Sequence, residues 1–328
     1  MKYVKLQNTG LEVSKICVGC MNLGAKDKYP WHLDKQEGIE YIKHALDSGI
    51  NFFDTANVYS QGESEEILGE AIKQYGNRDE LVIATKVFYP VDNSLNGRGL
   101  SRKHIFQAVE DSLRRLQLDY IDLYIIHRFD YNTPLEETMA ALNDLVRMGK
   151  VRYIGASAMY AWQFQKAQYI AMKNGWSKFV SMQNHYNLLY REDERELIPL
   201  CKDMNIPLTP YSPLAGGRLT RDWNGDTLRD KYDQTVKEKY DMSKTIDYPI
   251  VKRVGEIAES KQISRAQVAM SWLLQKDNVV PIVGGTKVKH LDEAISALDV
   301  TLSDEEINSV MENIISELKS SLGAELRR

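Results

Sequence analysis

The sequence contains few cysteines, and their spacing does not favour a metal or redox centre. Cys17, Cys20 and Cys201 are too few for a disulfide framework. Cys17 and Cys20 form a CxxC pair, but a zinc site needs two further ligands and a redox CxxC normally opens a helix. The surrounding ICVGCMNLG is instead typical of a strand that enters a glycine-containing loop. We therefore expect no metal site here and no redox role.

The chain also lacks long apolar runs and a strong charge of one sign. No apolar run approaches the roughly 18 residues of a membrane-spanning helix. The first residues, MKYVKLQNTG, have no apolar core of a signal peptide, which favours a cytoplasmic location. A formal charge of −4 gives no electrostatic footprint for nucleic acid or for an anionic membrane. The expected partner is a small molecule, and the oligomeric state stays open.

Eight short apolar runs recur along the chain and predict buried parallel strands. They lack the polar alternation of a half-exposed strand, so both faces of the sheet should be covered by helices. The expected strands are residues 16–19, 51–54, 81–86, 121–127, 151–157, 179–183, 206–212 and 279–285.

Helix signals lie between these runs. Thr133, Pro134 and Glu136 suggest an N-cap, a first-turn proline and a capping-box acid, and Gly149 supplies a stop. Ser101 should begin another helix, and Ser303 with Glu306 should cap a terminal one. The charged stretch 216–247 is the strongest candidate for an extended loop.

Strands that alternate with helices eight times predict an α/β fold, a (β/α)8 TIM barrel. A doubly wound Rossmann sheet would need GxGxxG just after a strand, and the GRG at 97–99 and AGG at 215–217 do not continue to a third glycine. The segment before residue 15 resembles an N-terminal β-hairpin that turns at residues 8–10 and could plug one end of the barrel. No linker divides residues 1–328, so we expect a single domain.

Polar residues stand where three neighbouring strands end. Asp54, Lys86 and His127 close the runs FFD, IATK and IIH, and Tyr59 lies on the loop after Asp54. In a TIM barrel the βα loops form one mouth at the carboxyl ends of the strands, so these four side chains should converge. Taken singly, each residue is more often a helix cap, a packing group or a solvated charge; taken together they favour a site.

The predicted cluster has the chemistry of proton delivery. A phenol with a pKa of about 10 donates poorly near neutrality, and a nearby ammonium lowers that pKa by stabilising the phenolate. Lys86 could act on Tyr59 in this way while Asp54 holds Lys86 charged and in place. His127 could share the proton or donate a hydrogen bond to a substrate oxygen. Such a cluster would protonate an oxygen as it becomes an alkoxide.

Five blocks of the sequence carry a resemblance to a known family: GINFFDTANVYSQGESEEILGEAI, LVIATKV, DSLRRLQLDYIDLYIIHRFD, GKVRYIGAS and YSPLAGGRLT. They resemble the aldo-keto reductase superfamily over roughly residues 3–310, most of all its YajO-type and aryl-alcohol-dehydrogenase-like members. The resemblance implies a TIM barrel, NADP(H) as cofactor, and a catalytic tetrad of Asp54, Lys86, His127 and Tyr59, with Tyr59 as general acid.

The resemblance also implies positions for the cofactor. Ser157 and Gln183 would hydrogen-bond the nicotinamide carboxamide, and Tyr211 would stack beneath the ring. Ala158 stands where many members have asparagine. The loops after the seventh and eighth strands would hold the phosphates, with Lys287 on a ribose 2′-phosphate. The further expected contacts are Gly19, Cys20, Met21, Ser212, Pro213, Leu214, Gly216, Arg218, Gly284, Thr286 and His290.

The expected activity is NADPH-dependent reduction of a small-molecule aldehyde or ketone to an alcohol. Trp31, Phe88 and Phe129 are candidates for the apolar substrate wall, or for ordinary packing at the rim. One alternative is an NADPH-binding redox sensor similar to potassium-channel β subunits, which retain the same tetrad. Another is an enzyme directed at sugars.

Overall fold

A computed structural model describes residues 1–223 and 227–311. These residues form two compact units. The first consists of Met1–His185, Glu192–Tyr211 and Asn278–Leu291, and the second of Tyr186–Arg191, Ser212–Asp277 and the residues from Asp292 onward. The single-domain organisation over residues 1–328 stays a prediction. The division into two compact units does not show whether each unit can fold separately.

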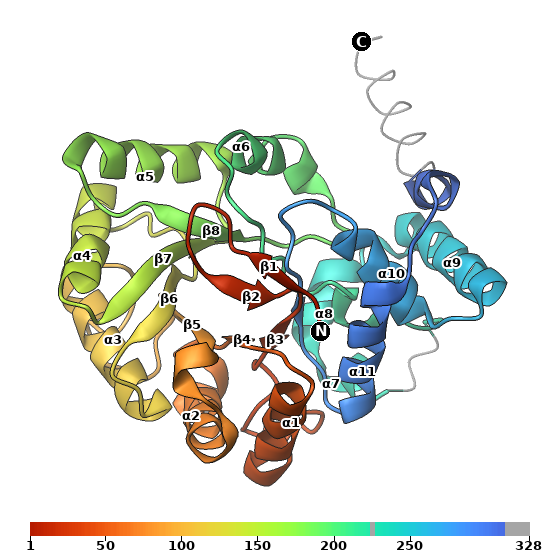
Figure 1. Cartoon of the computed structure of the whole chain (residues 1–328), viewed down its shortest axis with the longest axis horizontal. Helices are drawn as coiled ribbons and strands as arrows, with labels where there is room; N and C mark the ends of the chain where they lie inside the picture. The colour runs from red at the N-terminus through yellow and green to blue at the C-terminus, as the bar shows by residue number, and fades with distance from the viewer. Residues whose placement is uncertain (224–226, 312–328) are drawn as a thin grey trace. The chain divides into compact units, whose positions relative to one another are not determined.

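The first unit contains a curled sheet of seven parallel strands in the order β8-β7-β6-β5-β4-β3-β9 (Figure 1). Each pairing is parallel, as two-sided apolar runs predict. The strands are β3 (Cys17–Gly19), β4 (Phe52–Asp54), β5 (Val82–Val87), β6 (Ile121–Ile126), β7 (Val151–Ser157), β8 (Phe179–Gln183) and β9 (Ile282–Val283).

The predicted seventh strand, 206–212, closes this sheet through isolated bridges. Leu208 forms parallel bridges to Met182 at the end of β8 and to Val279 just before β9. Pro207 and Pro210 lack backbone N–H groups, which explains why this segment makes no continuous ladder. Because the bridges join both edges of the sheet, the fold is the predicted (β/α)8 barrel.

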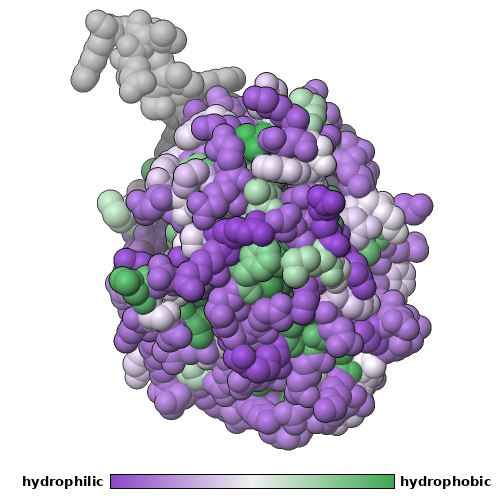
Figure 2. Space-filling model, turned by 90° about the vertical axis from the view of Figure 1, so that its left-hand side faces the viewer, coloured by the Kyte–Doolittle hydropathy of each residue, from purple (hydrophilic) through white to green (hydrophobic). Residues whose placement is uncertain are grey.

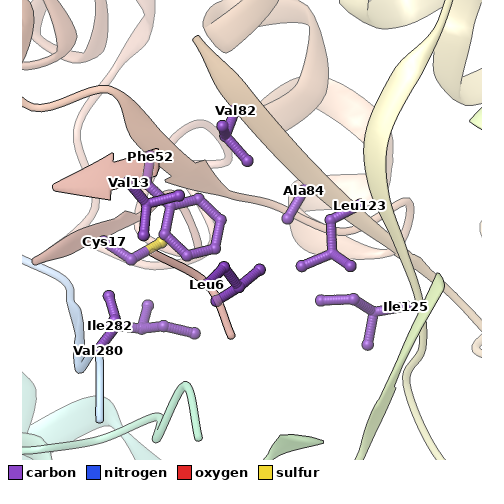
Figure 3. Close-up of a cluster of buried hydrophobic side chains, with 10 residues drawn as sticks. All are labelled: Leu6, Val13, Cys17, Phe52, Val82, Ala84, Leu123, Ile125, Val280 and Ile282. Carbon is purple, nitrogen blue, oxygen red and sulfur yellow. The ribbon is translucent and has the colours of Figure 1, made fainter. Parts of the chain in front are cut away.

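The N-terminal hairpin is confirmed and supplies part of the core. Strands β1 (Tyr3–Lys5) and β2 (Glu12–Ser14) pair antiparallel. Leu6 and Val13 from the hairpin are fully buried in one hydrophobic cluster with side chains from β3, β4, β5, β6 and β9 (Figure 3). The hairpin therefore fills one end of the barrel, which leaves the carboxyl ends of the strands as the open mouth.

Helices of the first unit lie outside the sheet (Figure 1). Ser101 caps α3 as predicted, accepting a hydrogen bond from the His104 N–H. The predicted cap of α4 is wrong by one residue: Pro134 occupies the N-cap position, and the hydroxyl of Thr133 donates to Asp130 instead. These helices are α1 (Lys35–Asp47), α2 (Glu63–Tyr75), α3 (Arg102–Leu116), α4 (Leu135–Arg147), α5 (Ala161–Asn174) and α6 (Leu197–Asp203).

The second unit is helical, and it corrects the expectation of an extended loop over 216–247. That segment contains two short helices and the start of a third, while 224–226 lie outside the described residues. Thr227 and Asp233 cap the short helices with their side chains. The expectation of a loop rested on the charged composition and did not consider these caps. The helices are α7 (Leu228–Tyr232), α8 (Gln234–Tyr240), α9 (Lys244–Lys261) and α10 (Arg265–Leu274), with α11 (Val288–Ser296) shared between the units.

The described residues contain neither a membrane-spanning helix nor a cluster of metal-ligating side chains. No helix there combines the length and hydrophobicity needed to cross a bilayer. The face drawn in Figure 2 is mainly hydrophilic, with hydrophobic residues in separate small patches. Across residues 1–223 and 227–311, no group of His, Cys, Asp or Glu could hold a metal ion. Burial raises the pKa of all three free thiols, which makes them poor nucleophiles.

Candidate active site

Strand alternation directs the predicted site residues into the barrel. Successive residues of a strand point to opposite faces. Phe52, Ala84 and Ile125 point into the core cluster. Asp54, Lys86 and His127 each follow one of them by two residues, so they point the same way, one layer nearer the mouth. The sequence therefore places three polar side chains above an apolar floor.

Lys86 is fully buried and is the centre of the cluster. Its ammonium Nζ donates to Oδ2 of Asp54 at 2.6 Å, to the backbone oxygen of Thr55 at 2.7 Å and to the hydroxyl of Tyr59 at 3.2 Å. An ammonium group has three donors, so all are satisfied. Burial alone would lower the pKa of Lys86, but the Asp54 carboxylate and the Tyr59 phenol raise it above its ordinary value. Lys86 is thus a fixed cation beside a phenol.

Asp54 is also held from its second side. Its Oδ1 accepts a hydrogen bond from Nε2 of Gln183 at 2.9 Å. Asp54 is 3% exposed, and a carboxylate at that depth is stable only if both oxygens have donors. Gln183 thereby links the end of β8 to the ends of β4 and β5.

Tyr59 is positioned by a strained turn. It begins a 3-10 helix, η1 (Tyr59–Gly62), whose next residues, Ser60 and Gln61, have φ values of 49° and 56°. Left-handed backbone costs a non-glycine residue about 1–2 kcal/mol. The hydroxyl of Ser60 donates to the backbone oxygen of Leu23 and helps to hold this conformation. Strain of this kind is common at functional sites.

The pKa of Tyr59 differs from the sequence expectation. Burial raises it above the ordinary value, and Lys86 lowers it by less than burial raises it. The predicted effect of Lys86 is therefore present but outweighed, and the expectation of a lowered pKa is wrong for this structure. A raised pKa keeps the phenol protonated at neutral pH, which leaves Tyr59 with a proton to give.

His127 lies against Tyr59 without a hydrogen bond between the two rings. Their centroids are 5.8 Å apart in an edge-to-face arrangement. Within the described chain, Nδ1 of His127 is buried and has no hydrogen-bond partner. Burial and the cations of Lys86 and Arg128 hold the pKa of His127 well below its usual range. The imidazole is therefore neutral at pH 7.

This lowered pKa gives the folded protein a pH dependence. Because unfolded histidine binds a proton at about pH 6.5 and buried His127 does not, the free energy of unfolding should fall as the pH drops below about 6.5. The slope from this group is at most about 1.4 kcal/mol per pH unit, and less because the ring is partly exposed. The free energy of unfolding can be measured with urea at several pH values between about 5 and 6.5. Its dependence on pH should be weaker for His127→Gln than for the unchanged chain. Equal slopes would refute the assignment.

Two residues of the first unit offer groups suited to a nicotinamide, a hydroxyl for its carboxamide and an aromatic ring for its plane. The Ser157 hydroxyl donates to the backbone oxygen of Gln183, so its lone pairs remain available to an amide N–H. The ring of Tyr211 stacks on His185 with centroids 5.2 Å apart, and this fixes the plane of the predicted platform. Ala158 has a φ of 45°, a conformation that asparagine tolerates better than alanine. The chemistry of this group fits the predicted cofactor.

The predicted residues around β3 differ in what they can offer. A Cβ on Gly19 would lie 2.7 Å from Cγ2 of Ile282, so this glycine is required by strand packing. Cys20 is buried, while Met21 is 43% exposed. The structure therefore leaves Met21 as the accessible side chain of these three.

The segment after β9 presents small and cationic groups. A Cβ on Gly284 would have its nearest neighbour, Asn22 Nδ2, at 3.4 Å, so the backbone there can be approached closely. The backbone N–H of Thr286 donates to Nδ1 of His290 at 3.4 Å. Lys287 and His290 are exposed. An exposed lysine beside accessible backbone is compatible with a phosphate ligand.

The remaining predicted contacts belong to the second unit. Arg218 is 7% exposed, pairs with Asp241 at 2.5 Å and lies over the ring of Trp223. Part of its guanidinium is therefore already paired with residues of the second unit. A Cβ on Gly216 would clash with Val236. The other members of this group, Ser212, Pro213 and Leu214, precede the short 3-10 helix η4 (Ala215–Gly217).

The aromatic candidates for a substrate wall lie after three different strands. Trp31 packs edge-on to Tyr29, Phe88 packs edge-on to Tyr89, and Phe129 packs edge-on to Tyr131. Among the ring contacts of the described residues, none links one of these pairs to another.

Sequence reasoning missed two residues at the same mouth, Tyr89 and Arg128. The guanidinium Nε of Arg128 donates to the Tyr89 hydroxyl at 2.9 Å, and the ring of Tyr89 lies edge-on to His127 at 5.1 Å. Their position just past the ends of β5 and β6 could have identified them.

Comparisons with known proteins identify the family of the chain. The model of the aldo/keto reductase family matches residues 15–315. The versiconal hemiacetal acetate reductase of Aspergillus parasiticus is 45% identical over 95% of this chain and 96% of its own. A Saccharomyces cerevisiae protein provisionally named as an aryl-alcohol dehydrogenase is 46% identical over the same shares. An aldo-keto reductase of Alternaria alternata is 44% identical over 93% of this chain and 89% of its own.

Proposed function

Because the chain belongs to the aldo/keto reductase family of oxidoreductases, we propose that it reduces aldehydes or ketones to alcohols with NADPH, and that Tyr59 is the general acid. The observation that carries the proposal is the Lys86 ammonium, which donates at once to Asp54, Thr55 and the hydroxyl of Tyr59. Such a buried cation beside a strained tyrosine is suited to stabilising a phenolate that forms during reaction.

The protein's own residues account for the proton transfer. When bound, NADPH supplies the hydride to the carbonyl carbon. Tyr59 donates its proton to the carbonyl oxygen, and Lys86 stabilises the phenolate left behind. Asp54 keeps Lys86 charged and in place, and Gln183 keeps Asp54 in place. Neutral His127 beside Tyr59 contributes a polar ring that can bind the substrate oxygen without competing as a cation.

Ser157, Gln183 and Tyr211 would hold the nicotinamide end of the cofactor, and Lys287 would select NADPH by its 2′-phosphate. A hydrogen bond to a charged group contributes about 1.5–3 kcal/mol, so NADPH should bind roughly tenfold to a hundredfold more tightly than NADH. Lys287→Met should remove most of this preference. Lys173→Met, at an exposed position on α5, is the matched control and should keep it. A dissociation constant for NADPH no lower than that for NADH would contradict this part of the proposal.

The test of the activity is NADPH consumption by the purified protein with 4-nitrobenzaldehyde. We take aromatic carbonyl compounds as the substrate class because one relative is named as an aryl-alcohol dehydrogenase. Turnover that depends on the aldehyde supports the reductase. Tight NADPH binding without turnover of any aldehyde would favour the redox-sensing alternative. A cytoplasmic location belongs to the same proposal.

A further inference from the structure

Arg128 extends across the mouth of the barrel. It follows His127 directly, after β6, and its Nε–H donates to the hydroxyl of Tyr89 beyond β5. It also hydrogen-bonds the phenol of Tyr211, at the end of the 206–212 segment. In the order of the sheet, β7 and β8 separate β6 from the edge that this segment closes. A side chain with both contacts must therefore lie over the interior of the mouth.

The charge of Arg128 is not neutralised by the residues around it. The groups that act on it electrostatically are the phenols of Tyr89 and Tyr211, and in the described part of the chain no carboxylate pairs with it. Asp54 and Lys86 neutralise each other, and His127 is neutral. Arg128 is half-buried, and a partly desolvated cation without an anionic partner is unfavourable. The mouth thus carries an uncompensated positive charge next to His127.

The guanidinium retains donors for a ligand. It has five N–H groups in a planar fork. The one on Nε donates to Tyr89 and another is used by Tyr211, so three N–H groups remain. These can donate to a carboxylate, an anion that guanidinium groups commonly bind through two hydrogen bonds. Tyr89 and Tyr211 restrict the rotation of the side chain, so little conformational freedom is lost on binding.

We propose that Arg128 binds a carboxylate of the substrate, so that the preferred substrates are carbonyl compounds that carry a carboxylate. This inference rests on the proposed reductase function and names the substrate class of that site. The positive charge also attracts such a substrate before it binds, an effect that salt weakens.

The test compares matched substrates. The 3- and 4-carboxybenzaldehydes are anionic, while the 3- and 4-nitrobenzaldehydes are neutral and of nearly the same shape. We measure kcat/KM for all four with NADPH, for the unchanged chain and for Arg128→Met, Arg128→Lys and the exposed-site control Arg147→Met. For at least one ring position, Arg128→Met should lower the ratio of carboxy to nitro substrate by tenfold to a hundredfold, on the order expected for a charged hydrogen bond. Arg128→Lys should lower the ratio of carboxy to nitro substrate by less than Arg128→Met does. Arg147→Met should leave that ratio unchanged.

Other outcomes separate the explanations. An equal loss on carboxy and nitro substrates, with weaker NADPH binding, would mean that Arg128 only positions Tyr211, and would overturn the proposal. An unchanged ratio would also overturn it. If no aldehyde is turned over, the reductase function fails, and binding of 4-(hydroxymethyl)benzoate against 4-nitrobenzyl alcohol then tests Arg128 directly. Weaker binding of 4-(hydroxymethyl)benzoate to Arg128→Met than to the unchanged chain would support the anion site. Equal binding of this ligand to the two proteins would refute it.

Discussion

Replacing Tyr59 with phenylalanine should lower kcat for carbonyl reduction by roughly a hundredfold to ten-thousandfold, the contribution typical of a positioned general acid. The substitution removes one oxygen, which accepts a hydrogen bond from Lys86 at 3.2 Å. Lys86 keeps its two shorter bonds, to Asp54 and to Thr55, so the cluster should stay folded. The measurements are NADPH consumption with 4-nitrobenzaldehyde and equilibrium binding of NADPH, which should be nearly unchanged.

The matched control is Tyr131→Phe. Tyr131 is 71% exposed, lies after β6, and its hydroxyl accepts a hydrogen bond from Gln163 on α5. It should retain full activity. If Tyr59→Phe kept comparable activity, proton delivery would have to come from His127 or water, and the assignment of Tyr59 would be wrong.

The barrel and the converging strand ends were predictable because they depend on local pattern. Apolar runs such as VIATKV and IDLYII specify strands that are buried on both faces, and parallel strands have to end at one edge. Asp54, Lys86 and His127 were therefore placed together without any knowledge of distances. The alternation that carries Ala84 into the core carries Lys86 to the same side.

The contacts of Arg128 could not be predicted, because they depend on the reach of one side chain across the barrel. Tyr211 is 83 positions away in the chain numbering, and the closing strand that carries it is interrupted by Pro207 and Pro210. Local pattern gives no sign that an arginine past β6 meets a tyrosine at that distance. The direction of the pKa shift at Tyr59 could not be predicted either. It depends on whether burial raises the pKa by more than Lys86 lowers it, and local pattern does not show the depth of burial.

Errors at helix starts and in the charged segment have a different cause, which is competition among side-chain caps. Thr133 was a sound N-cap candidate, but its hydroxyl donates to Asp130, so the helix begins one residue later. In the second unit, Thr227 and Asp233 start short helices within a stretch whose charge suggested a loop. Capping residues favour turns as well as helix starts, so three-dimensional context decides between them.

Replacing Lys86 with methionine should affect both activity and stability. Met fills a similar volume but leaves Asp54 a buried carboxylate whose remaining side-chain donor is Gln183. Removing one partner of a buried ion pair costs about 3–5 kcal/mol of unfolding free energy. Activity should fall by on the order of a hundredfold or more, because the phenolate of Tyr59 loses its stabilising cation. Urea unfolding and NADPH consumption measure the two effects separately.

The double variant Asp54→Asn, Lys86→Met distinguishes the two roles of this pair. Neutral asparagine removes the stranded charge, so the double variant should regain much of the stability that Lys86→Met loses. It should not regain activity, because no cation is restored beside Tyr59. A double variant as unstable as the single one would mean that Lys86 stabilises the fold through its bond to Thr55 or through packing. Recovery of activity together with stability would show that the ammonium acts only as a structural support, and the proposed mechanism would then lose its basis.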